Sequence, residues 1–166
     1  MALTKTVSGG QTGVDRGALD AALAVGFPCG EWCPEDRRAE DGPIPERYPM
    51  TPFPGGRHRE RSQRNVIDSD GTVIFYYRSL TGGTLLAHES FVREKKPFIL
   101  LDATQFTESD ASDAIVRFIE EHDIKVLNVA GPRLSGWVTG YGFALAVVGE
   151  VIRRESTNGV ARWRIG

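Results

Sequence analysis

The chain lacks the features that mark several protein classes. It has two cysteines, Cys29 and Cys33, in 166 residues, too few for a disulfide scaffold or a four-ligand zinc site. No apolar run approaches the ~20 residues needed to cross a bilayer, and the N-terminus lacks the basic-then-apolar plan of a signal peptide. We therefore expect a cytoplasmic protein with reduced thiols and no membrane association.

The chain also has no large excess of positive or negative charge, because 20 Lys and Arg and 22 Asp and Glu give a formal net charge of −2. No global basic field argues for nucleic acid as a partner, so any anion site must be local. The length fits one domain. We place a ligand-binding domain at 1–152, with a long loop inserted at 34–60, and a C-terminal tail at 153–166.

Glycine is abundant, with 19 residues, about 11% of the chain against a usual ~7%. Predicted strands near 4–7, 71–76, 97–101 and 125–129 alternate with glycine turns and helical patterns, and a fifth strand is expected near 28–32. This order is typical of α/β proteins. We predict a Rossmann-like three-layer sandwich with a mostly parallel sheet of about five strands.

The inserted segment is rich in proline, because six of the nine prolines lie between positions 34 and 54. A loop longer than ~12–15 residues inside a compact domain is usually functional or disordered. Aromatic residues in this segment favour an ordered loop. It carries Arg37 and Arg38, which could hold an oxyanion. The alternative is a solvated loop in which these arginines pair with Glu40 and Asp41.

Two glycine loops are candidate anion sites, because each follows a predicted strand and opens a predicted helix. There, backbone N–H groups and the helix dipole attract negative charge. The first loop consists of Ser8, Gly9, Gly10, Gln11, Thr12 and Gly13, and the second of Gly82, Gly83 and Thr84. Neither is a G-x-G-x-x-G or Walker A motif. The alternative for the first loop is a turn whose glycines only permit close helix packing.

No convincing catalytic set is present. A nucleophile needs a base within hydrogen-bond reach. The histidines His58, His88 and His122 lie in a predicted loop and on two predicted helices, without an obvious chain of acceptors. The sequence therefore favours binding over catalysis, and we predict no catalytic residues and no metal-ligating side chains.

Several blocks together resemble one family. They are the segment from Ser8 to Ala18, Trp32-Cys33-Pro34, the segment from Arg37 to Pro45, the segment 61–66, and the segment from Asn128 to Arg133. These blocks are similar to the family of putative molybdenum carrier proteins, a circularly permuted YpsA-like branch of the SLOG superfamily of Rossmann-like nucleotide-binding domains. The likeness covers roughly residues 4–150.

The resemblance implies self-association into dimers or tetramers and binding of a small anionic ligand, either molybdenum cofactor, molybdate or a nucleotide-like molecule. A carrier would deliver its cargo to molybdoenzymes or cofactor-insertion proteins. The ligand loops would be 8–13, 82–84 and Gly131, with Arg37 and Arg38 as further contacts.

The superfamily offers two alternatives. One is a sensor for a nucleotide signal, which the glycine loops fit equally well. The other is a Lonely-guy-like phosphoribohydrolase acting on nucleoside monophosphates, whose signature carries a Glu three residues after a Thr. In this chain Ala87 stands three residues after Thr84, and Glu89 lies about 200° further round a helix. Hydrolysis would then need another acid, such as Asp15 or Asp41.

Overall fold

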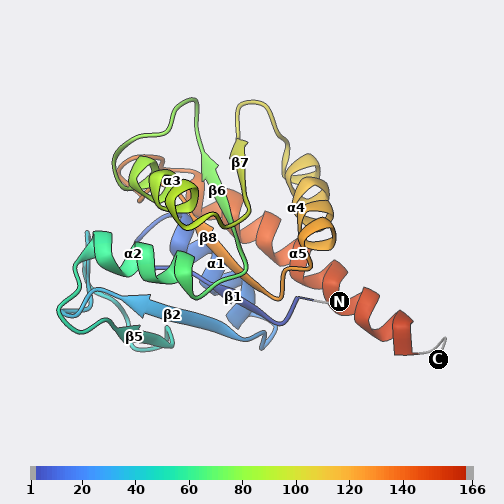
Figure 1. Cartoon of the computed structure of the whole chain (residues 1–166), viewed down its shortest axis with the longest axis horizontal. Helices are drawn as coiled ribbons and strands as arrows, with labels where there is room; N and C mark the ends of the chain where they lie inside the picture. The colour runs from blue at the N-terminus through green and yellow to red at the C-terminus, as the bar shows by residue number, and fades with distance from the viewer. Residues whose placement is uncertain (1–2, 164–166) are drawn as a thin grey trace.

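The computed structural model describes residues 3–163, apart from the side chains at 83, 86–88, 90–91 and 159–163. Its sheet is parallel, in the order β5-β2-β1-β8-β6-β7 (Figure 1). The strands are β1 Lys5–Val7, β2 Cys29–Cys33, β5 Met50–Pro52, β6 Gly71–Tyr76, β7 Phe98–Asp102 and β8 Val126–Ala130. The helices are α1 Val14–Leu23, α2 His58–Ile67, α3 Gly82–Glu94, α4 Glu108–His122 and α5 Gly140–Trp163.

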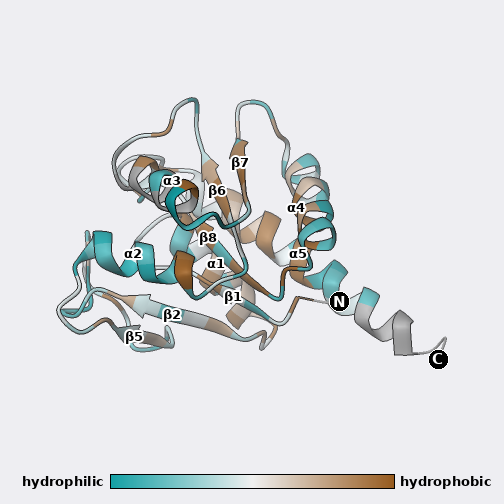
Figure 2. Cartoon of the chain, in the orientation of Figure 1, coloured by the Kyte–Doolittle hydropathy of each residue, from teal (hydrophilic) through white to brown (hydrophobic). Residues whose placement is uncertain are grey.

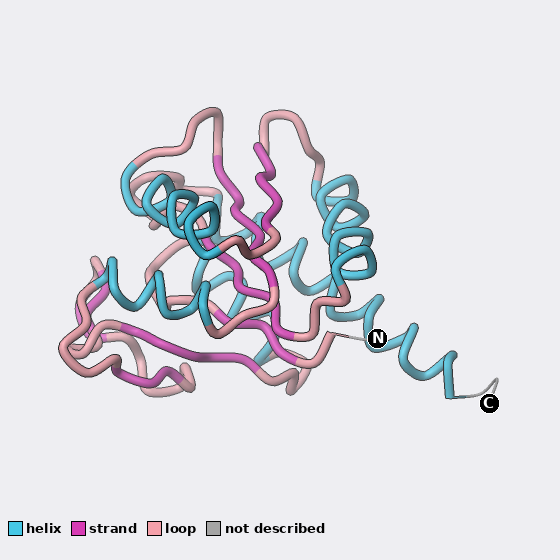
Figure 3. The backbone as a smooth tube through the Cα atoms, in the orientation of Figure 1, coloured by secondary structure: helices cyan, strands magenta, loops and turns pink. Residues whose placement is uncertain are grey.

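Helices cover both faces of the sheet, which confirms the predicted α/β, Rossmann-like three-layer fold (Figures 1 and 3). Successive side chains of β6 point to opposite faces of the sheet, and both faces are covered. Val73 and Phe75 pack into the main core with α1, α4 and α5, whereas Ile74 packs on the other face with Val66 of α2. A strand buried on both faces reads as the continuous apolar run that its sequence shows.

The proline-rich segment contains more regular structure than predicted, because it contributes a strand to the sheet. Met50–Pro52 forms β5, which pairs with β2 and raises the strand count from the expected five to six. β5 is an edge strand, the position in a sheet where proline is tolerated. The segment also holds a two-residue hairpin, β3 Arg38–Ala39 and β4 Gly42–Pro43. Ile44, Tyr48 and Met50 of the segment form a small core with Leu19 of α1 and Cys33 of β2.

The C-terminal segment predicted as a tail begins inside α5. This helix continues to Trp163, and Glu155 within it is buried and accepts a hydrogen bond from the Leu3 amide at 3.2 Å. Residues 164–166 lie outside the described part of the chain. Among residues 3–163, no helix is both long and apolar enough to cross a membrane.

Candidate functional site

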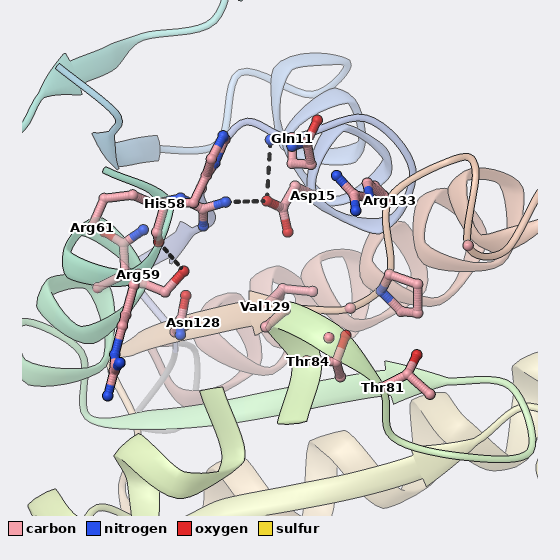
Figure 4. Close-up of a pocket in the computed structure, with 18 of the residues that line it drawn as sticks. Gln11, Asp15, His58, Arg59, Arg61, Thr81, Thr84, Asn128, Val129 and Arg133 are labelled. Atoms are coloured by element: carbon pink, nitrogen blue, oxygen red, sulfur yellow. Dashed lines mark hydrogen bonds and ion pairs between the residues drawn. The ribbon is translucent and has the colours of Figure 1, made fainter. Parts of the chain in front are cut away.

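A pocket of about 510 Å³ opens at the carboxyl ends of β1, β8 and β6 (Figure 4). From β1 the chain passes through α1 to β2 on one side, and from β6 it passes through α3 to β7 on the other. Open α/β sheets bind ligands where the strand order reverses in this way. The lining residues are Gly9, Gln11, Asp15, His58, Arg59, Arg61, Ser62, Asn65, Thr81, Gly82, Thr84, Asn128, Val129, Ala130, Gly131, Pro132, Arg133, Ser135 and Gly136.

Several cationic side chains line the pocket. Arg59 and Arg61 come from the first two turns of α2, together with His58, and Arg133 comes from the loop that follows β8. The α2 helix is hydrophilic over most of its length (Figure 2), and only Asn65 and Val66 near its end are buried. The helix therefore attaches to the domain through its last turn, where Val66 packs in the core and Asn65 hydrogen-bonds the backbone of Trp32, and its basic first turns line the pocket.

Arg61 and Asp15 face each other inside this pocket (Figure 4). Arg61 Nη2 lies 3.6 Å from Asp15 Oδ2, and the two side chains are only 11% and 6% exposed. The same Oδ2 accepts the backbone N–H of Gln11 at 3.1 Å. Burial raises the pKa of Asp15, while Arg61 and the Gln11 N–H act in the opposite direction. Partial burial, together with Arg61, lowers the pKa of His58.

Uncharged side chains form another wall of the pocket. Asn128 of β8 and Thr84 of α3 line it and are 4% and 5% exposed. Asn128 Nδ2 donates to Thr72 Oγ1 at 3.2 Å, which holds the carboxamide in place. Gly82 begins α3 at this wall, so the positive end of that helix dipole also faces the pocket.

The structure brings five of the predicted site residues to the pocket and places the others elsewhere. Those that line it are Gly9, Gln11, Gly82, Thr84 and Gly131. Those outside the lining are Ser8, Gly10, Thr12, Gly13, Arg37 and Arg38. Gly83 belongs to α3, but its surroundings are outside the described part of the chain.

Part of the first glycine loop is closed by contacts within the protein. The Ser8 N–H donates to the Gly30 carbonyl, and the Thr12 N–H donates to Gln11 Oε1. The Val14 N–H at the start of α1 donates to the Pro132 carbonyl. A Cβ at Gly13 would lie 2.6 Å from that same carbonyl oxygen. The packing role that we kept as an alternative thus accounts for much of this loop.

The two arginines of the proline-rich segment do not reach the pocket. Arg37 donates to the carbonyls of Met50 at 3.0 Å and Ile44 at 3.3 Å, so it ties its own loop together. Arg38 is exposed. The alternative, in which these arginines pair with the neighbouring acids, is also not observed: Asp41 pairs with Arg16, and Glu40 accepts hydrogen bonds from Thr12 and Ser135.

The cations of α2 were not predicted as site residues from the sequence. A signal was present, because five of the eight residues from Arg57 to Arg64 are Arg or His. Which of them face the sheet edge depends on how α2 packs through Val66, and a helix this polar gives little periodicity from which to read that face.

Comparison with known proteins agrees with this architecture. The model of the circularly permutated YpsA SLOG family matches residues 6–152, and the chain belongs to this family. It is also similar to the crystal structure of a protein named as a putative molybdenum carrier protein from Syntrophus aciditrophicus SB. The two share 39% sequence identity and a TM-score of 0.87, over 91% of this chain and 95% of the other. A comparison with curated proteins found no significant match.

Proposed function

We propose that this protein binds a small, phosphate-bearing or oxyanionic ligand in the pocket and carries it, the cargo being molybdenum cofactor or molybdate. The observation that supports this most directly is the presence of three arginines, Arg59, Arg61 and Arg133, in the lining of one pocket. Guanidinium groups match phosphate and other oxyanions with paired hydrogen bonds.

The pocket favours a ligand with two chemically different ends. The arginines would hold the anionic end, and Asn128 and Thr84 on the uncharged wall would bond a flat polar group such as a pterin. A volume of about 510 Å³ lies within the usual range for small-molecule sites. A molybdate ion alone would use only the arginines, so the uncharged wall favours the organic cofactor.

The similar protein from Syntrophus carries the name of a molybdenum carrier, which supports the same class of cargo. The rest of the proposal follows the family resemblance: a cytoplasmic dimer or tetramer, with molybdoenzymes or cofactor-insertion proteins as recipients. A nucleotide sensor would use the same arginines and is distinguished by its ligand.

Hydrolysis of nucleoside monophosphates is the less favoured alternative. Glu89 does not line the pocket, and Asp15 is the one carboxylate among the described lining residues. Asp15 already accepts the Gln11 N–H and faces Arg61. Asp41 pairs with Arg16 outside the pocket.

The test is calorimetric titration of molybdate, inorganic pyrophosphate and AMP into the wild type and the variants Arg59→Gln and Arg133→Gln. Loss of a charged hydrogen bond costs about 1.5–3 kcal/mol, so we expect binding of the preferred anion to weaken roughly 10- to 150-fold. Arg64→Gln is the matched control, because Arg64 lies on the same helix but pairs with Asp68 outside the pocket lining.

Equal affinities of Arg59→Gln, Arg133→Gln and Arg64→Gln would contradict the proposed site. Elemental analysis of the purified protein identifies the cargo: molybdenum that co-purifies supports the carrier, whereas tight binding of AMP with no metal supports the sensor.

A further inference from the structure

Asp15 places a buried carboxylate inside a pocket whose other charged lining residues, within the described chain, are cations. It lies in the first turn of α1, and its side chain is 6% exposed. Its Oδ2 accepts a hydrogen bond from the Gln11 N–H and faces the Arg61 guanidinium. These two groups are donors that a bound oxyanion would itself use. The carboxylate therefore stands where a ligand's negative charge would be most favourable.

Arg61 keeps unused donor capacity in this arrangement. The 3.6 Å separation from Asp15 is longer than a hydrogen bond. Arg61 Nε is buried and, within the described part of the chain, has no hydrogen-bond partner. An oxyanion that entered the pocket would find free N–H groups on Arg61, but it would also meet the like charge of Asp15 at close range.

We propose that Asp15 is a built-in competitor of the ligand, so that anion binding is coupled to the uptake of one proton by the Asp15 carboxyl group. The inference rests on the anion-binding function proposed above. In the empty pocket the carboxylate partly neutralises Arg61. When an anion binds, a proton from solvent converts the carboxylate to the neutral acid, and Arg61 is released to the ligand.

The surroundings of Asp15 support such a transfer. Burial already favours its neutral form and raises its pKa. The groups that face it are the Ser8 side chain and the Gln11 N–H from the first glycine loop, and Arg61 and His58 from α2. A second negative charge in this space would favour the neutral acid further, because like charges at short range disfavour ionisation of both groups. A ligand held in this way is released as pH rises.

His58 also titrates at this site, and its contribution to the pH dependence of anion binding must be distinguished from that of Asp15. Its pKa is lowered by burial and by Arg61, and a bound anion would also draw a proton onto the imidazole. Both residues therefore make anion binding stronger at low pH, but the two substitutions have opposite effects. Removing the charge of Asp15 strengthens binding at high pH, whereas removing His58 weakens binding at low pH.

The experiment is calorimetric titration of sulfate, a dianion that does not titrate near neutral pH, into the wild type, Asp15→Asn and His58→Gln. Each titration is repeated in two buffers with different ionisation enthalpies, which gives the number of protons taken up. Asparagine keeps an acceptor for the Gln11 N–H. At mildly alkaline pH we expect Asp15→Asn to bind sulfate about tenfold more tightly than the wild type. Proton uptake should fall in Asp15→Asn by more than in His58→Gln.

Each outcome distinguishes the two proposals. If Asp15→Asn binds sulfate no more tightly than the wild type, the competitor role of Asp15 is overturned, but the proposed anion-binding function is not. Unchanged proton uptake in Asp15→Asn has the same consequence. If sulfate binds to neither protein, and molybdate and pyrophosphate also fail to bind, both proposals fall together.

Discussion

The guanidinium of Arg61 lies directly over the backbone of Gly9. A Cβ built at Gly9 would stand 1.5 Å from Arg61 Nη1 and 2.0 Å from Arg61 Cζ. Glycine at this position is therefore the condition for Arg61 to reach Asp15 and the pocket. The first glycine loop contributes here by leaving room for a cation from another element.

Gly9→Ala is expected to weaken anion binding, because the methyl group displaces Arg61 from its place over the loop. The loss should approach that of an Arg61 truncation, about 10-fold or more for a charged hydrogen bond. Titration of the preferred anion measures it. A Gly9→Ala protein that folds and binds the anion as tightly as the wild type would show that Arg61 does not act from this position.

Gly10→Ala is expected to lower the stability of the fold and to leave anion binding unchanged. Gly10 has φ +79°, and its Cβ would point at Ile44 Cδ1, 3.1 Å away, on the side of the loop away from the pocket. The left-handed backbone costs a non-glycine residue about 1–2 kcal/mol. We expect the free energy of unfolding to fall by about that amount in urea titrations, with the anion affinity of the folded protein unchanged. A loss of affinity instead would return Gly10 to the binding site.

The roles of these neighbouring glycines could not be predicted from the sequence, whereas much of the fold could. The fold follows from local patterns: the predicted strand 71–76 has the observed bounds Gly71–Tyr76, and the Thr107 side chain caps the start of α4, a position at which Thr is preferred. The site depends on which partner each loop residue meets. Gly9 and Gly10 look alike in sequence, and only the packing of α2 and of the proline-rich segment gives them different roles.

Glu40 links the proline-rich segment to the pocket. It accepts hydrogen bonds from the Thr12 hydroxyl at 2.5 Å and from the Ser135 hydroxyl at 2.6 Å and N–H at 3.0 Å, and Arg133 lies 3.8 Å away. The hydrogen bonds from Ser135 and Thr12 lower the pKa of Glu40 below its usual 4.5. These contacts hold the pocket loop after β8 against the loop after β1.

Because the folded pKa of Glu40 is lowered, its contribution to stability is present above the unfolded value and is lost as pH falls through the folded value. Hydrogen exchange at the Leu134 and Ser135 amides should therefore accelerate below about pH 4.5, beyond the intrinsic change in exchange rate. Glu40→Gln should show faster exchange already at neutral pH and lose this acid-dependent component. An unchanged pH profile in Glu40→Gln would assign the loop's order to other contacts.

Gly17 of α1 and Gly149 of α5 lie in the layer formed by these two helices, and alanine at the two positions should have opposite effects on stability. A Cβ at Gly17 of α1 would lie 2.4 Å from the Tyr141 carbonyl oxygen, so Gly17→Ala must push the two helices apart, and overpacking of this kind costs about 1–3 kcal/mol. Gly149 lies inside α5, and its Cβ would meet Ala21 Cβ at an ordinary 3.9 Å. Gly149→Ala should therefore stabilise the protein by about 0.5–1 kcal/mol through helix propensity. Urea unfolding of both variants measures the two signs, and stabilisation by Gly17→Ala would contradict the close approach of α1 and α5.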